Sequence, residues 1–500
     1  MVEIGPGQLI GEIGFFSGGV RTAAVYAARD SEVLEIHRDA FEALTARVPD
    51  IRRAITRALA ERLAGLATIA RDRESADSLS ARRMIAVVSA GEPPAGDEFL
   101  ARFASRAPKR LKVRLLAPSD APSLLRGGAS APSAYASALS TIETEHHLVI
   151  CVTSPTLDDW TEAVLRSCDQ VLFVAGGAPA SPGAVERMAL ELFPVSRRRL
   201  VLVEPSRVGF APPSREWRRE RESFMLHHVA LQDDDDLDSL WRFLTGNAIG
   251  LVASGGGAFG PGHVGIHKAF LERGFTFDIF GGASVGSAIA ATFAFLMHPD
   301  DISAATQEMF VRRACLKRLA FPRYGLLDHH VFDQELRLRY PGDIEDLWKP
   351  FFAVATDLST YSLRVMRSGP LWQALRASSA IPGVLPPWFG PDGHMLVDGG
   401  VTDNVPVGAM NALKSGPNLV IDLRPLSYRK FKVDYAAIPG RWSVLARTLA
   451  PWPAARKMPR APGPVAVIQR SLFGNIRERI ALADSPELAL RPRRFRVRVS

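Results

Sequence analysis

The chain has 500 residues, of which 47% are hydrophobic and 23% are charged, so it can bury several cores and does not have the composition of a disordered protein. Its formal net charge of +8 fits an anionic partner or a membrane surface. The basic residues are spread along the chain without interleaved aromatic side chains or a nucleic-acid-binding motif, so we expect no nucleic-acid partner.

The cysteines and the apolar runs limit the cellular setting. Cys151, Cys168 and Cys315 are odd in number and lack the spacing of a metal site, so we expect reduced, mostly buried thiols and no bound metal. The longest apolar run, AIAATFAFLM, is too short to span a bilayer, and the N-terminus has no basic-then-apolar signal. These features predict a cytoplasmic protein without a membrane-spanning segment.

The first two predicted domains precede the residues that carry chemistry. Residues 1–72 contain two strand-like stretches, TAAVYAA and SEVLEI, and then a helical pattern over residues 38–66. After a polar linker, residues 84–245 alternate helical stretches with the buried strands MIAVVSA, LKVRLLA, HLVICV, QVLFVAG and RRLVLVE, which predicts an α/β domain with a parallel sheet. The first strand is followed by AGEPPAGDE, which lacks the Lys-Ser/Thr of a phosphate-binding loop, so we predict a non-catalytic spacer.

Ser284 is the strongest candidate nucleophile. It lies between Gly282 and Gly286, after the strand-like FTFDIFG and before the helical SAIAATFAFLM. Glycine is needed on both sides of a serine in such a tight strand-to-helix turn, because side chains there would clash. The pattern predicts an exposed hydroxyl at the start of a buried helix, whose N-terminal amides favour negative charge.

A serine hydroxyl also needs a group that stabilises an oxyanion. The stretch SGGGAFGPGH, which includes Gly255, Gly256, Gly257 and Ala258, follows the strand-like GLVAS and precedes a helix. Such a loop can direct adjacent backbone amides at one oxygen. The alternatives are an ordinary glycine-rich turn and a dinucleotide-binding fingerprint, whose spacing is met only loosely.

The general base is predicted to be Asp398 rather than a histidine. The apolar strand in MLVDGGVTDNVPV ends at this aspartate, and the two following glycines let the chain turn close to another backbone, although Asp-Gly-Gly is also found in ordinary turns. None of the histidines lies in a loop that clearly returns to the serine. We expect surface or helix-capping roles for the histidines near these motifs, which are His263, His267, His329, His330 and His394.

Together with RASSAIPGVLPP and VDGG, these blocks resemble the patatin-like phospholipases, which use a Ser-Asp dyad without a catalytic histidine. The order of the segments resembles the neuropathy target esterase (NTE) branch, most specifically over residues 247–406. The resemblance implies a three-layer α/β/α catalytic domain at 247–430, an intermediate domain before it and a basic extension at 431–500. It implies that Ser284 is the nucleophile, Asp398 the base and residues 255–257 the oxyanion hole, with residues 376–383 as structural support. The family usually has arginine where this chain has Phe259, which bears on efficiency and head-group preference.

The N-terminal stretch GEIGFFSGGVRTAAV is similar to the phosphate cassette of a cyclic-nucleotide-binding β-roll. By this resemblance Glu12 would hold the ribose hydroxyl and Arg21 the cyclic phosphate, with Gly11, Thr22 and Ala23 completing the cradle. The strands that normally precede the cassette are absent from the sequence, so either the chain is a fragment or the domain is incomplete. An incomplete β-roll favours a structural role, and we expect no tight binding of a cyclic nucleotide.

We therefore predict a serine acyl hydrolase that cleaves phospholipid or lysophospholipid esters without a cofactor. The alternatives are a non-catalytic, cyclic-nucleotide-responsive scaffold and a neutral-lipid or simple-ester hydrolase with the same dyad. A bilayer substrate predicts peripheral association with a membrane. FVRRACLKRLAFPRYGLL, residues 310–327, is predicted to be an interfacial helix, although a core-facing helix with a basic solvent face has the same pattern.

Overall fold

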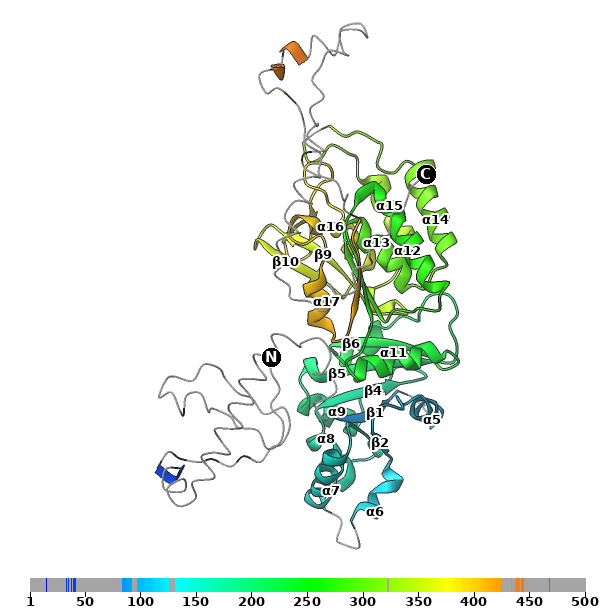
Figure 1. The fold of residues 1–500 in the computed structure, drawn as a ribbon, viewed down its shortest axis with the longest axis vertical. Coiled ribbons are helices and arrows are strands. Elements are labelled where there is room, and N and C mark those ends of the chain that lie inside the picture. Colours follow the sequence, from blue (N-terminus) through cyan, green and yellow to red (C-terminus); the bar gives the residue numbers. More distant parts are fainter. Residues whose placement is uncertain are drawn as a thin grey trace.

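The computed structural model describes residues 83–91, 97–125, 131–321 and 323–423, together with isolated positions nearer both ends. Two β-sheets organise these residues, and they lie one above the other in Figure 1. The predicted cyclic-nucleotide positions Gly11, Glu12, Arg21 and Thr22 lie outside the described residues, as does nearly all of the predicted 1–72 domain and of the 431–500 extension.

The first sheet has six strands in the order β2-β3-β1-β4-β5-β6, and all of its pairs are parallel. Its strands are β1 (Arg83–Ala90), β2 (Val113–Leu116), β3 (Leu148–Val152), β4 (Gln170–Ala175), β5 (Arg198–Glu204) and β6 (Met225–Ala230). Its helices are α5 (Asp97–Ser105), α6 (Ala121–Leu124), α7 (Pro132–Glu145), α8 (Asp159–Ser167), α9 (Ala184–Leu192), α10 (Arg215–Glu220) and α11 (Asp234–Leu244). The predicted parallel α/β arrangement is confirmed, and sequence analysis missed β6, whose MLHHVA contains two histidines.

Alternate residues of the central strands face opposite layers of helices. Met84, Ala86 and Val88 of β1 pack with side chains of α7, α8 and α9, whereas Ile85 and Val87 pack with side chains of α5 and α11. Both faces are therefore covered, which explains why the predicted strands are apolar at nearly every position.

The second sheet has seven strands in the order β11-β12-β9-β8-β7-β13, with β10 paired to β9. Its strands are β7 (Gly250–Ala253), β8 (Ile279–Ala283), β9 (Phe351–Asp357), β10 (Ser362–Met366), β11 (Trp388–Phe389), β12 (Met395–Asp398) and β13 (Asn418–Ile421). Its α-helices are α12 (Pro261–Leu271), α13 (Val285–Ala294), α14 (Pro299–Gln307), α15 (His330–Arg339), α16 (Leu371–Ser378) and α17 (Val407–Leu413). The pairs β13-β7, β7-β8 and β8-β9 are parallel, and those of β10, β11 and β12 are antiparallel.

Helices α12 to α16 cover one face of this sheet, and α17 lies on the other (Figure 1). On the α17 face, Met225 of β6 and Phe243 of α11 join the same core as Val252 and Phe352. The two sheet units thus share buried apolar side chains, so the unit with the six-stranded sheet also supports the unit with the seven-stranded sheet.

The predicted interfacial helix at 310–327 is wrong. A π-helical turn ends this helical stretch at Arg312, and the chain then continues irregularly to an antiparallel bridge between Leu319 and Leu327. Phe310, Leu316 and Leu327 pack against the core, while Leu319 and Phe321 are exposed. One apolar stripe was expected, but the apolar residues divide between two environments because the segment is not a continuous helix.

Two other expectations concern the state of the cysteines and the absence of a membrane-spanning helix. Cys151, Cys168 and Cys315 are buried and are not joined by disulfide bonds, as predicted. Among the described residues, no helix is both long enough and apolar enough to cross a membrane.

Candidate active site

Ser284 and Asp398 come together because two strands meet end to end along one side of β9. β8 pairs with residues 351–354 of β9, and β12 pairs with residues 355–357. β10 pairs across residues 353–357 and so occupies the other side of β9. β8 ends next to Ser284, and β12 ends at Asp398 opposite Ala355, so the two side chains reach the same point of the sheet.

The turn at Ser284 has the strained geometry of a nucleophile elbow. Ser284 precedes α13 and has a φ of 52° and a ψ of −132°, a backbone conformation that residues with a Cβ atom rarely adopt. Its N–H donates to Oγ of Ser378 at 2.9 Å, and this hydroxyl in turn donates to the carbonyl of Val354 at 2.7 Å. The last turn of α16 therefore holds the strained residue against β9.

The two flanking glycines are required by close backbone approaches. A Cβ atom on Gly282 would lie 2.5 Å from the carbonyl oxygen of Ala253, and one on Gly286 would collide with the carbonyl oxygens of Ala253 and Ser254. The end of β7 thus passes directly beside the serine turn, which explains the glycine on each side of Ser284.

Asp398 is buried beside the serine, with 2% of its surface exposed. One carboxylate oxygen, Oδ2, accepts a hydrogen bond of 2.5 Å from Oγ of Ser284, and Oδ1 accepts one of 2.8 Å from the N–H of Gly400. Burial raises the pKa of Asp398 to about 6, and these two hydrogen bonds offset the rise only in part. A carboxylate with such a pKa can accept a proton near neutral pH.

The glycine-rich loop lies against the same serine. A Cβ atom on Gly255 would be 3.1 Å from Cβ of Ser284. The N–H of Gly255 already donates to the carbonyl of Asn404 at 3.2 Å, so this predicted oxyanion donor is occupied. Within the described residues, no backbone acceptor is found for the N–H groups of Gly256, Gly257 and Ala258, which leaves these three as candidate oxyanion donors.

Asn404 is a site residue that sequence analysis missed. It is fully buried, and its Nδ2 donates to the carbonyl of Gly255 at 3.1 Å. Its Oδ1 has no hydrogen-bond partner and lies where a Cβ atom on Gly255 or Gly400 would be. The only sequence signal was a polar amide in the otherwise apolar NVPV stretch that follows the aspartate.

Phe259 belongs to a 3-10 turn, Gly257–Phe259, beside this loop. Its side chain is 64% exposed. The position where the family usually carries arginine is therefore an open, apolar surface in this chain.

The histidines have other partners, and two of them contradict the expected surface roles. His263 and His267 are buried; burial lowers the pKa of each to about 4, and Nε2 of His263 bonds to the carbonyl of Ser254 at 2.8 Å. Nδ1 of His394 bonds to Asp357 at 2.6 Å. His329 is the N-cap residue of α15, but its side chain makes no capping hydrogen bond, and Nδ1 of His330 bonds to Asp328 at 2.7 Å. No hydrogen bond between Ser284 and a histidine is found in the described part of the chain.

Comparison with known proteins places these residues within a family. The model of the patatin-like phospholipase family matches residues 251–410, which contain both Ser284 and Asp398. An uncharacterized NTE family protein of Mycobacterium tuberculosis (strain CDC 1551 / Oshkosh) is 30% identical over 426 residues, which cover 84% of this chain and 69% of that protein. The chain belongs to the NTE family of patatin-like phospholipases. The predicted family and the predicted α/β fold class are thereby confirmed.

Other relatives of this NTE family chain are much longer. Lysophospholipase NTE1 of Mycosarcoma maydis is 26% identical over 92% of the chain, and patatin-like phospholipase domain-containing protein 6 of Mus musculus is 27% identical over 91%. The chain spans 28% and 37% of their respective lengths. A cyclic nucleotide-binding domain model matches residues 1–48. Among solved structures, VipD of Legionella pneumophila matches 32% of the chain at 19% identity with a TM-score of 0.24, a likeness too low to support an argument.

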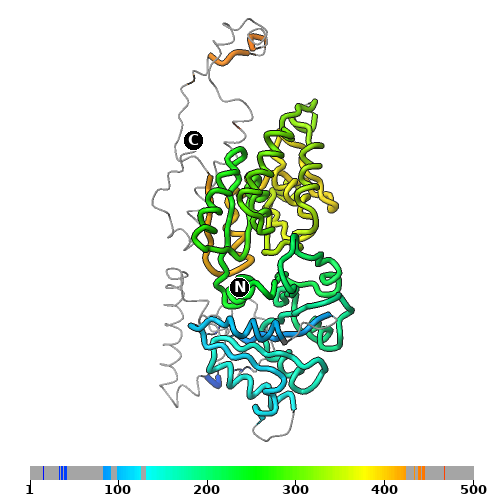
Figure 2. The backbone as a smooth tube through the Cα atoms, turned by 90° about the vertical axis from the view of Figure 1, so that its right-hand side faces the viewer, coloured from blue at the N-terminus to red at the C-terminus, as the bar shows by residue number. Residues whose placement is uncertain are grey.

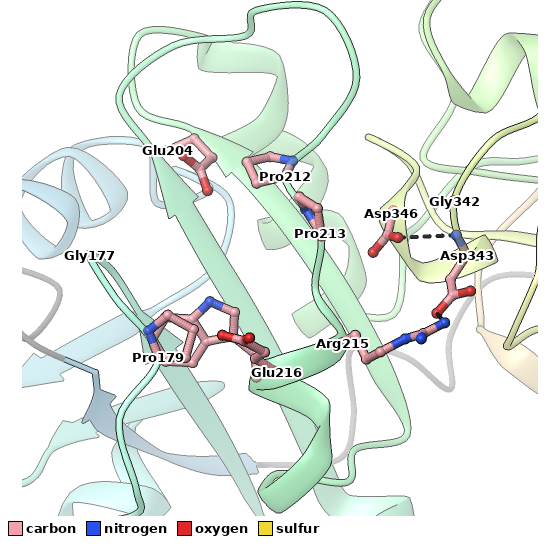
Figure 3. A pocket seen from close by; sticks show the side chains of 11 residues that line it. Gly177, Pro179, Glu204, Pro212, Pro213, Arg215, Glu216, Gly342, Asp343 and Asp346 are labelled. Atoms are coloured by element: carbon pink, nitrogen blue, oxygen red, sulfur yellow. Dashed lines mark hydrogen bonds and ion pairs between the residues drawn. The ribbon is translucent and has the colours of Figure 1, made fainter.

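A cavity of about 710 Å³ in this NTE family chain lies away from the dyad, between the two sheet units (Figure 3). Two of its carboxylates, those of Asp343 and Asp346, contact the other unit. Asp346 accepts from the N–H and the hydroxyl of Ser214 at 2.8 and 2.6 Å, and Asp343 pairs with Arg218 at 2.7 Å. Figure 3 also shows Arg215 directed toward Asp343. This cavity lies at the contact between the units, and Ser284 does not line it.

Proposed function

We propose that this chain hydrolyses fatty-acyl ester bonds of phospholipids or lysophospholipids through a Ser284–Asp398 dyad. The observation that carries the proposal is the 2.5 Å hydrogen bond from Oγ of Ser284 to a buried carboxylate whose pKa is raised to about 6. Membership of a phospholipase family supports the lipid ester as substrate, as do relatives named lysophospholipase and phospholipase.

In the first half of the reaction, Oγ of Ser284 attacks the acyl carbon and Asp398 takes the hydroxyl proton. The oxyanion that forms is stabilised by amides of residues 256–258, together with the N-terminal end of α13. When the C–O bond of the ester breaks, the proton passes from Asp398 to the departing alkoxide. The products of this half are an acyl-enzyme on Ser284 and a free alcohol, which is the lysolipid or the glycerophosphodiester.

In the second half, a water molecule attacks the acyl carbon and gives its proton to Asp398. The bond to Oγ breaks, the fatty acid leaves, and the proton returns to Ser284. Asp398 therefore ends the cycle in the protonation state in which it began. One water is consumed for each ester bond cleaved. A base with a pKa near the working pH suits both transfers.

Because a two-chain phospholipid stays in its bilayer, we infer that the chain works while bound peripherally to a membrane. The exposed apolar side chain of Phe259 beside the glycine loop is compatible with such a substrate.

The test is turnover of phosphatidylcholine and lysophosphatidylcholine by the purified chain, compared with the Ser284→Ala variant. A fluorophosphonate probe, which reacts with activated serines, should label the wild type and not the variant. Equal labelling of the two proteins would contradict the proposed nucleophile. Turnover of soluble esters without turnover of either lipid would favour a simple-ester hydrolase with the same dyad.

A further inference from the structure

A short hairpin follows the π-helical turn that ends at Arg312. We call residues 317–327, of which all but residue 322 are described, the docking hairpin. Leu319 and Leu327 form an antiparallel bridge, and the N–H of Ala320 donates to the carbonyl of Leu326 at 3.0 Å. Figures 1 and 2 show this part of the chain at the end of the seven-stranded unit that is far from the six-stranded sheet.

The base of the docking hairpin is fixed to the segment that holds Asp398. The N–H groups of Leu326 and Leu327 donate to the carbonyls of Gly383 and Val384 at 3.0 and 2.9 Å. Three residues before Gly383, the carbonyl of Ala380 accepts the N–H of Asp398 at 2.9 Å. The hairpin is therefore attached at its base to the chain beside the dyad.

The outer part of the hairpin exposes large apolar side chains. Leu319, Phe321 and Tyr324 are 83%, 88% and 71% exposed, while Leu316 and Leu327 at its base pack against the core. Three such side chains on one short hairpin leave apolar surface that folding has not buried. Large apolar side chains exposed together on one short segment are typical of an interaction site.

The charge on the same hairpin indicates which partner fits. Lys317, Arg318 and Arg323 are exposed, and the guanidinium of Arg323 lies 5.4 Å from the ring centre of Tyr324. No ion pair joins Lys317 or Arg318 to a carboxylate of the described residues, whereas the preceding Arg313 pairs with Glu308 and Glu335. Exposed apolar side chains flanked by basic side chains that have no ion pair are complementary to a bilayer whose surface carries anionic lipids.

We propose that the docking hairpin inserts Leu319, Phe321 and Tyr324 into the interfacial layer of an anionic bilayer, while Lys317, Arg318 and Arg323 bind lipid phosphate and carboxylate groups. This inference rests on the proposed function, because it assigns the surface by which that site reaches a lipid in its bilayer. The attachment to residues 383 and 384 orients the bilayer toward the side of the molecule that carries the dyad.

The test uses the Ser284→Ala protein, which does not consume the lipid, in co-sedimentation with two kinds of vesicle. One is phosphatidylcholine alone, and the other is phosphatidylcholine mixed with an equal amount of phosphatidylserine. We expect binding to the mixed vesicles that weakens with salt. Adding Lys317→Glu and Arg318→Glu should lower the affinity at least ~10-fold, because each basic residue near an anionic surface contributes separately. Leu319→Ser with Phe321→Ser should lower binding to a similar extent.

Matched controls lie on the six-stranded unit. Lys109 and Arg110 are exposed there, and reversing both lowers the formal net charge from +8 to +4, as the hairpin reversal does. Leu157→Ser with Val208→Ser removes apolar side chains that are 51% and 80% exposed. Both controls should bind like the parent, and thermal melting should show that every variant is folded.

Three outcomes overturn the inference: the parent fails to bind mixed vesicles, it binds both kinds of vesicle equally, or the folded hairpin variants bind as tightly as their controls. Because binding is measured without turnover, these outcomes are distinct from a failure of the proposed hydrolase. That failure would appear as equal lipid turnover, or none at all, in the wild type and in Ser284→Ala.

Discussion

Asp236, at the contact between the two sheet units, is buried against two cations, whereas Asp398 is buried against a hydroxyl and a backbone amide. Asp236 accepts from Nζ of Lys349 at 2.8 Å and from Nη2 of Arg207 at 2.5 Å. Asp398 accepts from Ser284 and Gly400, and no guanidinium or ammonium group of the described residues pairs with it. Both carboxylates are almost completely buried, so the difference lies in their partners.

The partners decide the direction in which each pKa moves. Burial alone raises the pKa of a carboxyl group, but at Asp236 the cations Lys349 and Arg207 outweigh it and the pKa falls below its ordinary value. At Asp398 burial prevails and the pKa rises to about 6. The comparison teaches that the molecule neutralises a buried carboxylate at the contact between the units, and leaves one without a cation at the position where the proposed mechanism moves a proton.

The largest expected effect on the free energy of unfolding comes from removing the carboxylate of Asp236. Asp236→Ala leaves Lys349 buried without its counter-charge and removes the acceptor of the Ala230 N–H. Loss of one partner of a buried ion pair typically costs about 3–5 kcal/mol, so we expect the free energy of unfolding to fall by that amount. Denaturant titration measures it, with the exposed Asp235→Ala on the same helix as control. A loss no larger than that of the control would show that the pair contributes little.

A change of opposite sign in the free energy of unfolding is expected at Asp398, which has no cation of the described residues beside it. The folded-state pKa of Asp398, about 6, lies above its ordinary value of 3.8, so the folded protein holds the proton more tightly than the unfolded chain. Stability contributed by this proton is present below about pH 4 and is lost as the pH rises to about 6. At higher pH the ionised group costs on the order of 1–3 kcal/mol.

Asp398→Asn should therefore raise the free energy of unfolding at about pH 8 and change it little at about pH 4, since an amide can still accept from Gly400 and donate to Ser284. Thermal melting at both pH values tests this. A variant that is less stable than the wild type at the higher pH would contradict the assignment of an unneutralised, buried carboxylate.

A smaller effect is expected at Asn404, which supports the glycine loop. Asn404→Ala removes the hydrogen bond to the carbonyl of Gly255, a contact worth about 1 kcal/mol. We expect kcat on a soluble ester to fall by several-fold, with a smaller change in KM, because the loop amides would be less well placed for the oxyanion. Asn247→Ala is the control, since Nδ2 of Asn247 makes a similar bond to the carbonyl of Thr245 at the other end of β7. Equal kinetics of the two variants would argue against a role for Asn404 in the site.

Local patterns were sufficient to predict the elements that position the dyad. Ser284 and Asp398 were identified because glycines and apolar strands adjoin them in sequence, and the structure brings the two side chains into hydrogen-bond contact. Ser378 was placed only by the resemblance, within the supporting block 376–383, and Asn404 was not assigned at all, because their hydrogen bonds reach residues 94 and 149 positions away. Such partners depend on the tertiary arrangement, which local spacing does not contain.

The errors have the same cause. His263 and His267 were expected at the surface or at a helix cap because neither lies in a loop that returns to the serine, but α12 turns both toward the core, where burial keeps them neutral near pH 7. Residues 310–327 have a helical spacing of apolar and basic side chains, yet tertiary contacts bury Phe310 and Leu316 and leave Phe321 outside. The sequence pattern identified the amphipathic character of the segment but not its conformation.

The most direct test of the central claim is the activity of Asp398→Asn on a soluble, short-chain chromogenic ester, with the exposed Asp392→Asn as the matched control. Asp398 is proposed to be the base, and loss of general-base assistance typically costs ~10²–10⁴-fold, so we predict a fall in kcat/KM of that size together with slower fluorophosphonate labelling of Ser284. Asp392→Asn should behave like the wild type. Near-wild-type turnover by a folded Asp398→Asn variant would contradict the account and assign the proton transfer to another group.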